Sequence, residues 1–141
     1  MKRICTFMLS ALALPLSLSA QTTTPPTGYK MVWSDEFNGT SLNTKVWNIE
    51  ENGNGGGNQE LQYYRKENVA VANGNLVLTA RRENYNNKQF TSGRINSRDK
   101  AYFKHGIIQA RIKFPKTANG VWPAYWMMGN DYGKLGWPRC G

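Results

Sequence analysis

The sequence predicts an all-β protein, and three observations support this fold class. Short segments rich in apolar, aromatic and β-branched residues are separated by clusters of Gly, Asn and Pro. No stretch shows the long helical periodicity of an amphipathic helix, and there is no heptad pattern or internal repeat. Without its first 20 residues, the 141-residue chain is enough for a small domain but modest for a large two-sheet one.

Residues 1–20 have the three-part layout of a secretory signal peptide. Lys2 and Arg3 precede a mostly apolar run over residues 4–18, and small residues end the segment. The run is too short for a convincing membrane span, although an uncleaved anchor is the alternative. We therefore expect a soluble protein that is secreted or periplasmic, with no membrane partner after cleavage of the signal.

Residues 21–28 contain two adjacent prolines and are expected to form a flexible leader, which leaves residues 29–141 as part of a folded domain. The formal net charge is +9, but the basic residues are scattered and form no stripe. We therefore expect a solvated basic surface and no nucleic-acid partner. Cys140 is the only cysteine after the signal segment, so the sequence predicts no internal disulfide.

The first predicted strand covers Tyr29 to Phe37. An Asn- and Gly-rich loop from Glu51 to Gln59 follows, and it lacks the strand-to-helix context of a phosphate-binding loop. Its glycines either let the backbone approach a ligand or simply turn. Asn68 to Ala72 and Leu76 to Arg81 flank Asn73-Gly74-Asn75, where the Asn-Gly pair predicts a tight hairpin because both residues tolerate positive φ.

Three later segments complete the predicted strands: Arg94 to Ser97, Gly106 to Phe114 and Val121 to Met128. The second alternates well, since one face carries Ile108, Ala110, Ile112 and Phe114 and the other is mostly polar. This pattern predicts a strand with one core face. Pro123 weakens the prediction for the last segment, because proline cannot donate a hydrogen bond to a sheet.

Three tryptophans near the end of the sequence are candidate sugar-binding residues. If the chain is extended here, Trp122 and Trp126 lie on one face with Ala124 between them, and Trp137 follows after a loop. Flat indoles with an N–H donor suit the apolar faces of sugar rings. Ordinary core packing accounts for the same tryptophans, and the pattern alone does not separate the two interpretations.

A polar segment from Asn58 to Tyr64 is a second candidate. Its amide and hydroxyl groups can pair with the donors and acceptors of sugar hydroxyls. A capped loop whose tyrosines pack on the core is the alternative. Arg94 follows Gly93 at the start of a predicted strand, and by itself it is weak evidence, because exposed arginines usually only solvate a surface.

The acidic residues form no local pair suited to glycoside hydrolysis. Retaining hydrolysis needs two carboxyl groups roughly 5 to 5.5 Å apart. Asp35 and Glu36 are adjacent and point to opposite faces of a strand, while Glu60 has no acidic neighbour nearby in sequence. His105 is the only histidine and gives no support to a multi-histidine metal site or a Ser-His-Asp triad. No catalytic or metal-binding residue is assigned.

Six motifs follow one another along nearly all of the chain after the signal segment. They are Val32 to Gly39, Asn58 to Tyr64, Thr91 to Ile95, Gly106 to Lys113, Trp122 to Trp126 and Gly136-Trp137-Pro138. In this order they resemble the motifs of the family 16 glycoside hydrolases, above all the bacterial laminarinase-like endo-β-1,3-glucanases. The strength of the resemblance lies in the order of the motifs.

The resemblance implies a concanavalin-like β-jelly-roll sandwich of two antiparallel sheets, with only the N-terminal half present here. It implies hydrolysis of internal β-1,3 or mixed β-1,3/1,4 glucan linkages with retention of configuration, through a covalent glycosyl-enzyme. In relatives, a Glu-x-Asp-x-x-Glu strand follows the Gly-Trp-Pro stretch directly. We therefore expect these 141 residues to lack the catalytic carboxylates, to leave an apolar face uncovered, and to be inactive and poorly folded alone.

The resemblance also implies roles for individual residues. Asn58 and Arg94 would contact sugar hydroxyls, Glu60 would support the Asn58 loop, and the stacking residues would be Trp122, Trp126 and Trp137. The expected partner is a β-glucan polysaccharide, and the full-length protein is expected to be a monomer. No cofactor is required, and a structural calcium ion near the segment resembling Asp35 to Gly39 is left open.

Two other functions are compatible with the sequence. A noncatalytic secreted β-sandwich that only binds glucan would use the same tryptophans. A structural or inhibitory secreted protein would bury them in its core.

Overall fold

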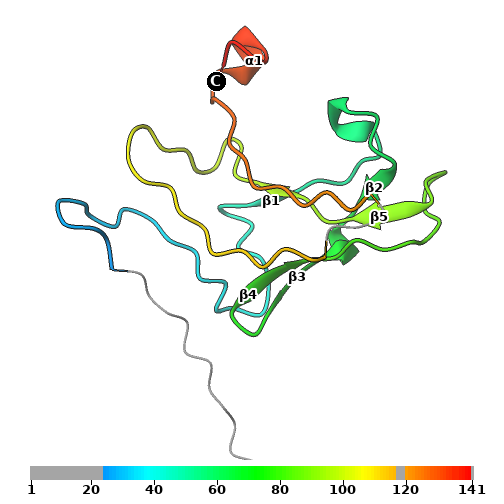
Figure 1. Ribbon diagram of the computed structural model, residues 1–141, viewed down its shortest axis with the longest axis horizontal. Helices are drawn as coiled ribbons and strands as arrows, with labels where there is room; N and C mark the ends of the chain where they lie inside the picture. Colours follow the sequence, from blue (N-terminus) through cyan, green and yellow to red (C-terminus); the bar gives the residue numbers. More distant parts are fainter. Residues whose placement is uncertain (1–23, 117–119, 141) are drawn as a thin grey trace, which may run out of the picture. The chain divides into compact units, whose positions relative to one another are not determined.

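The computed structural model of the protein describes residues 24–116 and 120–140 (Figure 1). The predicted signal peptide at 1–20 lies outside the described residues, as does the first part of the predicted leader. The chain divides into two units between Ser34 and Asp35. In the first unit, residues 24–34 form no strand, and the Tyr29 N–H closes a turn by donating to the Pro26 carbonyl at 3.0 Å.

The second unit consists mainly of strands. In the described residues these are β1 (Asn48–Ile49), β2 (Gln62–Tyr64), β3 (Val69–Ala72), β4 (Asn75–Leu78), β5 (Phe90–Ser92) and β6 (Ile95–Asn96). The helical elements are η1 (Gly55–Gly57), η2 (Lys66–Asn68) and α1 (Tyr132–Leu135). None of the helices in the described part of the chain is long and apolar enough to cross a membrane.

The strands pair two by two. β1 pairs with β6 and β3 with β4, both antiparallel, whereas β2 and β5 run parallel. Isolated bridges extend the β2–β5 pair on both sides, because Asn52 bridges to Tyr64 and Arg81 bridges to Thr91. The Glu50 N–H donates to the Arg94 carbonyl at 2.9 Å. The segment 48–52 is therefore bonded on one side to the β6 region and on the other to β2.

The predicted hairpin is confirmed. Asn73 and Gly74 have φ angles of 52° and 69°, and they form the two-residue loop between Ala72 and Asn75. Positive φ at both positions is what a type I′ turn requires. β4 ends at Leu78, earlier than predicted. The prediction at Arg94 to Ser97 is also confirmed, as β6.

The most buried side chains of the described residues are polar. Asn68 and Thr91 are each 1% exposed. The Asn68 Nδ2 donates to the Thr79 carbonyl at 2.7 Å and to the Thr91 Oγ1 at 3.0 Å, and the Thr91 hydroxyl donates to Glu83. The Asn68 Oδ1 is buried without a hydrogen-bond partner. A buried amide thus joins the β3–β4 hairpin to β5.

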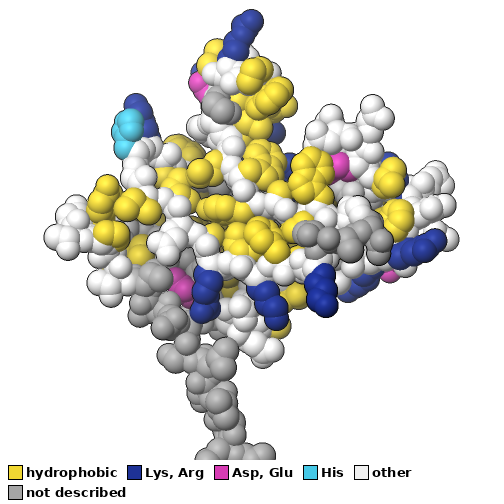
Figure 2. All heavy atoms as spheres, viewed as in Figure 1, with side chains coloured by type: hydrophobic (Ala, Val, Ile, Leu, Met, Phe, Trp, Pro, Cys, Tyr) yellow, Lys and Arg dark blue, Asp and Glu magenta, His cyan; other side chains and the backbone are white. Residues whose placement is uncertain are grey.

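Apolar burial is limited to a few positions. Val71 and Cys140 are the buried hydrophobic residues of the described chain. The Cys140 Sγ lies 3.3 Å from the Met128 Sδ. Figure 2 shows hydrophobic side chains gathered across the middle of the face in view. The exposed large hydrophobic residues of the described chain include Tyr102, Phe103, Ile112, Phe114, Tyr125 and Met127. Many large apolar side chains therefore lie on the surface of the described chain.

Three predicted strands are wrong. The described residues of Tyr29 to Phe37, Gly106 to Phe114 and Val121 to Met128 form no strand. Side-chain alternation distinguishes two faces, but a strand also needs a neighbouring backbone that bonds to it. The one-sided burial predicted for the second segment is wrong too, since Ile107 on one face and Ile108 on the other are 53% and 50% exposed.

A substitution at Gly93 tests how tightly the chain packs against the backbone carbonyl of Asn68. A Cβ at this position would lie 2.5 Å from the Asn68 backbone oxygen, closer than real Cβ contacts. That oxygen accepts the Thr79 N–H at 2.9 Å. We expect Gly93→Ala to displace the Asn68 carbonyl and to speed hydrogen exchange of the Thr79 amide about tenfold, or roughly 1.4 kcal/mol, measured by NMR.

Gly133→Ala is the matched control, because a Cβ there meets nothing within 4 Å. We expect this variant to leave exchange at Thr79 unchanged. If the Thr79 amide of Gly93→Ala exchanged at the wild-type rate, a Cβ at position 93 would not displace the Asn68 carbonyl.

Candidate functional site

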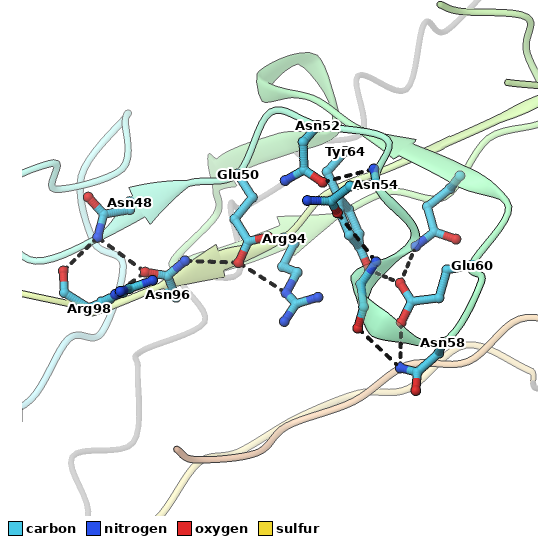
Figure 3. Close-up of polar contacts among 12 residues, drawn as sticks. Asn48, Glu50, Asn52, Asn54, Asn58, Glu60, Tyr64, Arg94, Asn96 and Arg98 are labelled. Carbon is cyan, nitrogen blue, oxygen red and sulfur yellow. Dashed lines mark hydrogen bonds and ion pairs between the residues drawn. The ribbon is translucent and has the colours of Figure 1, made fainter. Parts of the chain in front are cut away.

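The polar segment Asn58 to Tyr64 converges on the Glu60 carboxylate (Figure 3). Asn58 Nδ2 donates to Glu60 Oε1 at 3.0 Å, while Gln62 Nε2 and the Tyr64 hydroxyl donate to Oε2 at 2.6 and 2.7 Å. Glu60, Gln62 and Tyr64 share a face because every second residue of an extended chain points to the same side. Asn58 reaches Glu60 through the turn at Gln59, whose φ is 59°. The contact between Glu60 and Asn58 is the geometry that a supporting role for Glu60 requires.

Opposing effects set the ionisation of Glu60. Burial raises the pKa of its carboxyl, but hydrogen bonds from Asn58, Tyr64 and Gln62, together with the charge of Arg94, outweigh burial and bring the pKa below its ordinary value. Burial and the hydrogen bond to Glu60 raise the pKa of the Tyr64 hydroxyl. At neutral pH Glu60 is therefore an ionised acceptor. A carboxyl stabilised in this form is poorly suited to act as a general acid.

The glycine-rich loop before Glu60 is shaped by the same network. Gly56 has φ of 56°, and a Cβ there would lie 2.8 Å from the Glu60 Oε1. A Cβ at Gly53 would lie 2.7 Å from the ring of Tyr63. Of the two explanations that the sequence leaves open, these contacts favour the turn and its internal packing.

Arg94 lies between two aromatic rings and a carboxylate. Its Nε is 3.1 Å from Glu50 Oε1. Its Cζ is 5.5 Å from the ring centroid of Tyr64 and 5.1 Å from that of Trp126. Distances of this size are those of cation–π contacts. Since the side chain is only 24% exposed, the guanidinium is held and not merely solvated.

Two amides in turn orient the Glu50 carboxylate (Figure 3). Asn96 Nδ2 donates to Glu50 Oε1 at 2.9 Å, and Asn48 Nδ2 donates to Asn96 Oδ1 at 3.1 Å and to the Arg98 carbonyl at 2.8 Å. The register of β1 and β6 places Asn48 opposite Asn96. An open hollow of about 400 Å³ lies at this end of the network, lined by Asn48, Asn96, Arg98, Asp99 and Lys100.

The candidate tryptophans are exposed. Trp122, Trp126 and Trp137 are 73%, 53% and 72% exposed, which argues against core packing in this structure. Arg94 connects Trp126 to the network. In the part of the chain that the structure describes, no hydrogen bond or ring contact joins Trp122 or Trp137 to it. The structure therefore brings together four of the six predicted residues: Asn58, Glu60, Arg94 and Trp126.

Glu50, Gln62, Tyr64 and Asn96 belong to the network although none of them was predicted as an individual site residue. Alternation from Glu60 onward could have identified Gln62 and Tyr64 within the polar segment, since the three fall on the same face of an extended chain. Glu50 and Asn96 are brought to Arg94 by the pairing of β1 with β6. No local signal in the sequence predicts that pairing.

The described side chains do not by themselves offer a calcium ligand set near Asp35 to Gly39. Both Asp35 oxygens accept hydrogen bonds, from the Phe37 N–H at 3.0 Å and the Trp47 Nε1 at 2.8 Å. Across the described residues, no three His, Cys, Asp or Glu side chains are grouped so that they could hold a metal ion.

Comparisons with known proteins identify the relatives of this chain. The sequence model of the family described as "Beta-glucan synthesis-associated protein SKN1/KRE6/Sbg1" matches residues 8–139. The clotting factor G alpha subunit of Tachypleus tridentatus is 44% identical over 80% of this chain and 17% of its own length. The beta-glucanase of Rhodothermus marinus is 37% identical over 100% of this chain and 51% of its own length.

A solved structure, the laminarinase from Flavobacterium sp. UMI-01, matches with a TM-score of 0.71 and 45% identity, over 79% of this chain and 48% of that one. The chain thus spans about half the length of the glucanase and laminarinase that it matches. The structural match confirms the predicted jelly-roll fold class. The chain belongs to the family that this sequence model describes and, with its laminarinase relatives, to the family 16 glycoside hydrolases.

Proposed function

We propose that the chain forms the glucan-binding part of a secreted or periplasmic glycoside hydrolase. The enzyme cleaves internal β-1,3 or mixed β-1,3/1,4 glucan linkages with retention of configuration. One observation carries the proposal: Arg94 connects an exposed indole to the polar segment. Its guanidinium lies against Trp126, and its charge acts on Glu60, which accepts a hydrogen bond from Asn58. The proposed binding residues are Asn58, Glu60, Arg94, Trp122, Trp126 and Trp137.

The chemistry of these groups suits a neutral sugar. The indoles offer flat apolar surfaces to the C–H faces of pyranose rings, while the Arg94 guanidinium and the Asn58 amide offer hydrogen bonds to hydroxyl groups. Glu60 takes three hydrogen bonds from its own neighbours, so its part is to orient Asn58. The proposed partner is therefore a β-glucan chain. The protein is proposed to bind it as a monomer.

The carboxylates near the site are committed to internal contacts. Glu50 pairs with Arg94, and the pKa of Glu60 is lowered where a general acid needs a raised one. The sequence also contains no Glu-x-Asp-x-x-Glu motif. The proposal therefore places the nucleophile and the acid/base outside these 141 residues, with Arg94 and the tryptophans binding the sugar beside them.

A noncatalytic glucan-binding protein is the second candidate. The observation that favours it is the same site chemistry: sugar-binding groups are present, and the two carboxylates near them are engaged by neighbouring side chains. The description of the matching family also refers to glucan synthesis and not to hydrolysis.

Binding and hydrolysis assays separate the two candidates. Although the sequence predicts that the chain is poorly folded alone, the internal bonds around Glu60 and Arg94 support a formed site. We therefore expect the purified chain to bind laminarin, seen as a change in tryptophan fluorescence, to ignore dextran, and to release no reducing sugar. A longer reading frame of the same gene that encodes a Glu-x-Asp-x-x-Glu strand should hydrolyse laminarin and first release the β-anomer, measured by NMR. Hydrolysis by residues 1–141 alone would contradict the proposed location of the catalytic carboxylates. A longer frame that binds but never hydrolyses would favour the second candidate.

Trp122→Ala tests the stacking role. The indole is 73% exposed, so its removal should hardly change stability but should weaken laminarin binding about tenfold, measured by calorimetry. Tyr102→Ala is the matched control, because this ring is 69% exposed and lies outside the proposed site. Equal losses in the two variants would show that general surface hydrophobicity, and not a stacking site, binds the sugar.

The pH dependence of binding tests Glu60. Because its folded pKa lies below the ordinary 4.5, its contribution to the order of the Asn58 loop is complete above 4.5 and is lost as pH falls through the lower folded value. We expect laminarin affinity to fall on this acidic side. Glu60→Gln presents an amide donor to the donors of Gln62 and Tyr64, so it should bind weakly at pH 7 and lack the acidic fall. An acidic fall that persists in Glu60→Gln would assign it to another group.

A further inference from the structure

The ion pair between Arg94 and Glu50 is mostly buried. The two side chains are 24% and 25% exposed, and Nε lies 3.1 Å from Oε1. Buried pairs cost desolvation and are favourable only where further hydrogen bonds complete them. Here Asn96 provides one such bond to the same Glu50 oxygen at 2.9 Å. The Glu50–Arg94 ion pair is therefore part of a hydrogen-bonded network and not an isolated surface contact.

The geometry leaves part of the Arg94 guanidinium available. Glu50 engages Nε and the Tyr64 hydroxyl takes a further hydrogen bond from Arg94, so the remaining N–H groups of the guanidinium can act as donors. The guanidinium lies 5.1 Å from the Trp126 ring centroid, so Arg94 ties this residue to the sheet although residues 120–128 form no strand. A sugar that stacks on Trp126 would thus meet the remaining Arg94 N–H donors beside the ring.

Two carboxylates interact with the single guanidinium of Arg94. Glu50 contacts Arg94 directly, and Glu60 is close enough for the charge of Arg94 to lower the pKa of its carboxyl. The chain as a whole has a formal charge of +9. An anionic polymer would be attracted by the chain's net charge but repelled at this position, whereas a neutral sugar would be accepted.

We propose that Glu50 is a positioning and specificity-determining residue of the site. It orients Arg94 against Trp126 for hydrogen bonding to sugar hydroxyls, and its negative charge selects neutral over sulfated or carboxylated polysaccharides. The inference rests on the proposed glucan-binding function. Asn96 completes the arrangement by orienting Glu50.

The test compares Glu50→Gln with Glu67→Gln. Glu67 also pairs through one carboxylate oxygen with an arginine Nε, at 2.8 Å from Arg65, so the two substitutions have the same chemistry and change the net charge equally. Affinities for laminarin and for sulfated laminarin are measured by calorimetry. The Arg94 and Arg65 Nε–H signals are followed by NMR.

We expect Glu50→Gln to weaken laminarin binding about tenfold, to raise the affinity for sulfated laminarin relative to laminarin, and to expose the Arg94 Nε–H to faster exchange. Glu67→Gln should change only the Arg65 signal. A purely structural role for Glu50 would weaken both ligands alike, and that result would overturn the selectivity claim. Wild-type binding in Glu50→Gln would overturn the positioning claim.

Failure of the proposed glucan-binding function would give a different result from failure of the proposed role of Glu50. If the wild-type chain binds neither polysaccharide, the glucan proposal fails, and the Arg94 Nε–H signal still decides the positioning claim. An Arg94 signal with unchanged exchange in Glu50→Gln would then overturn it.

Discussion

The site depends on the pairing of one short segment with two neighbours. Residues 48–52 bond through Asn48 and Glu50 to the β6 region and through Asn52 to Tyr64 of β2. This double pairing places the Glu50 carboxylate beside the Arg94 guanidinium, and the ring of Tyr64 also faces that guanidinium. Without the pairing, Arg94 would lose its direct ion pair, because its sequence neighbours provide no counter-charge.

What the sequence predicts correctly in this protein is local. The Asn73-Gly74 turn forms because those two residues tolerate positive φ, and the contacts of Gln62 and Tyr64 with Glu60 follow from alternation along one extended segment. The Glu50–Arg94 pair joins residues far apart in sequence through the β1–β6 register, which no short pattern encodes. Gly106 to Phe114 shows the reverse case, in which a clear alternation finds no backbone partner among the described residues.

Polar groups hold much of the described structure together. Asn68 and Thr91 are more buried than any large apolar side chain, and they connect a hairpin to a neighbouring strand by directional bonds. Many large hydrophobic side chains lie on the surface instead. Hydrogen bonds fix the relative positions of the groups they join but add only modest net stability. The geometry of this unit is therefore specified mainly by hydrogen bonds and less by its small apolar core.

The amides that lead to Glu50 all donate in the same direction. Asn48 donates to Asn96, and Asn96 donates to the carboxylate. The backbone of Arg98 fixes the same orientation, because its carbonyl accepts from Asn48 Nδ2 and its N–H donates to Asn96 Oδ1. Such a chain has a polarity, and each bond in it polarises the next. The side chain at position 50 therefore meets an N–H whose direction the backbone has already set, and only a hydrogen-bond acceptor suits that place.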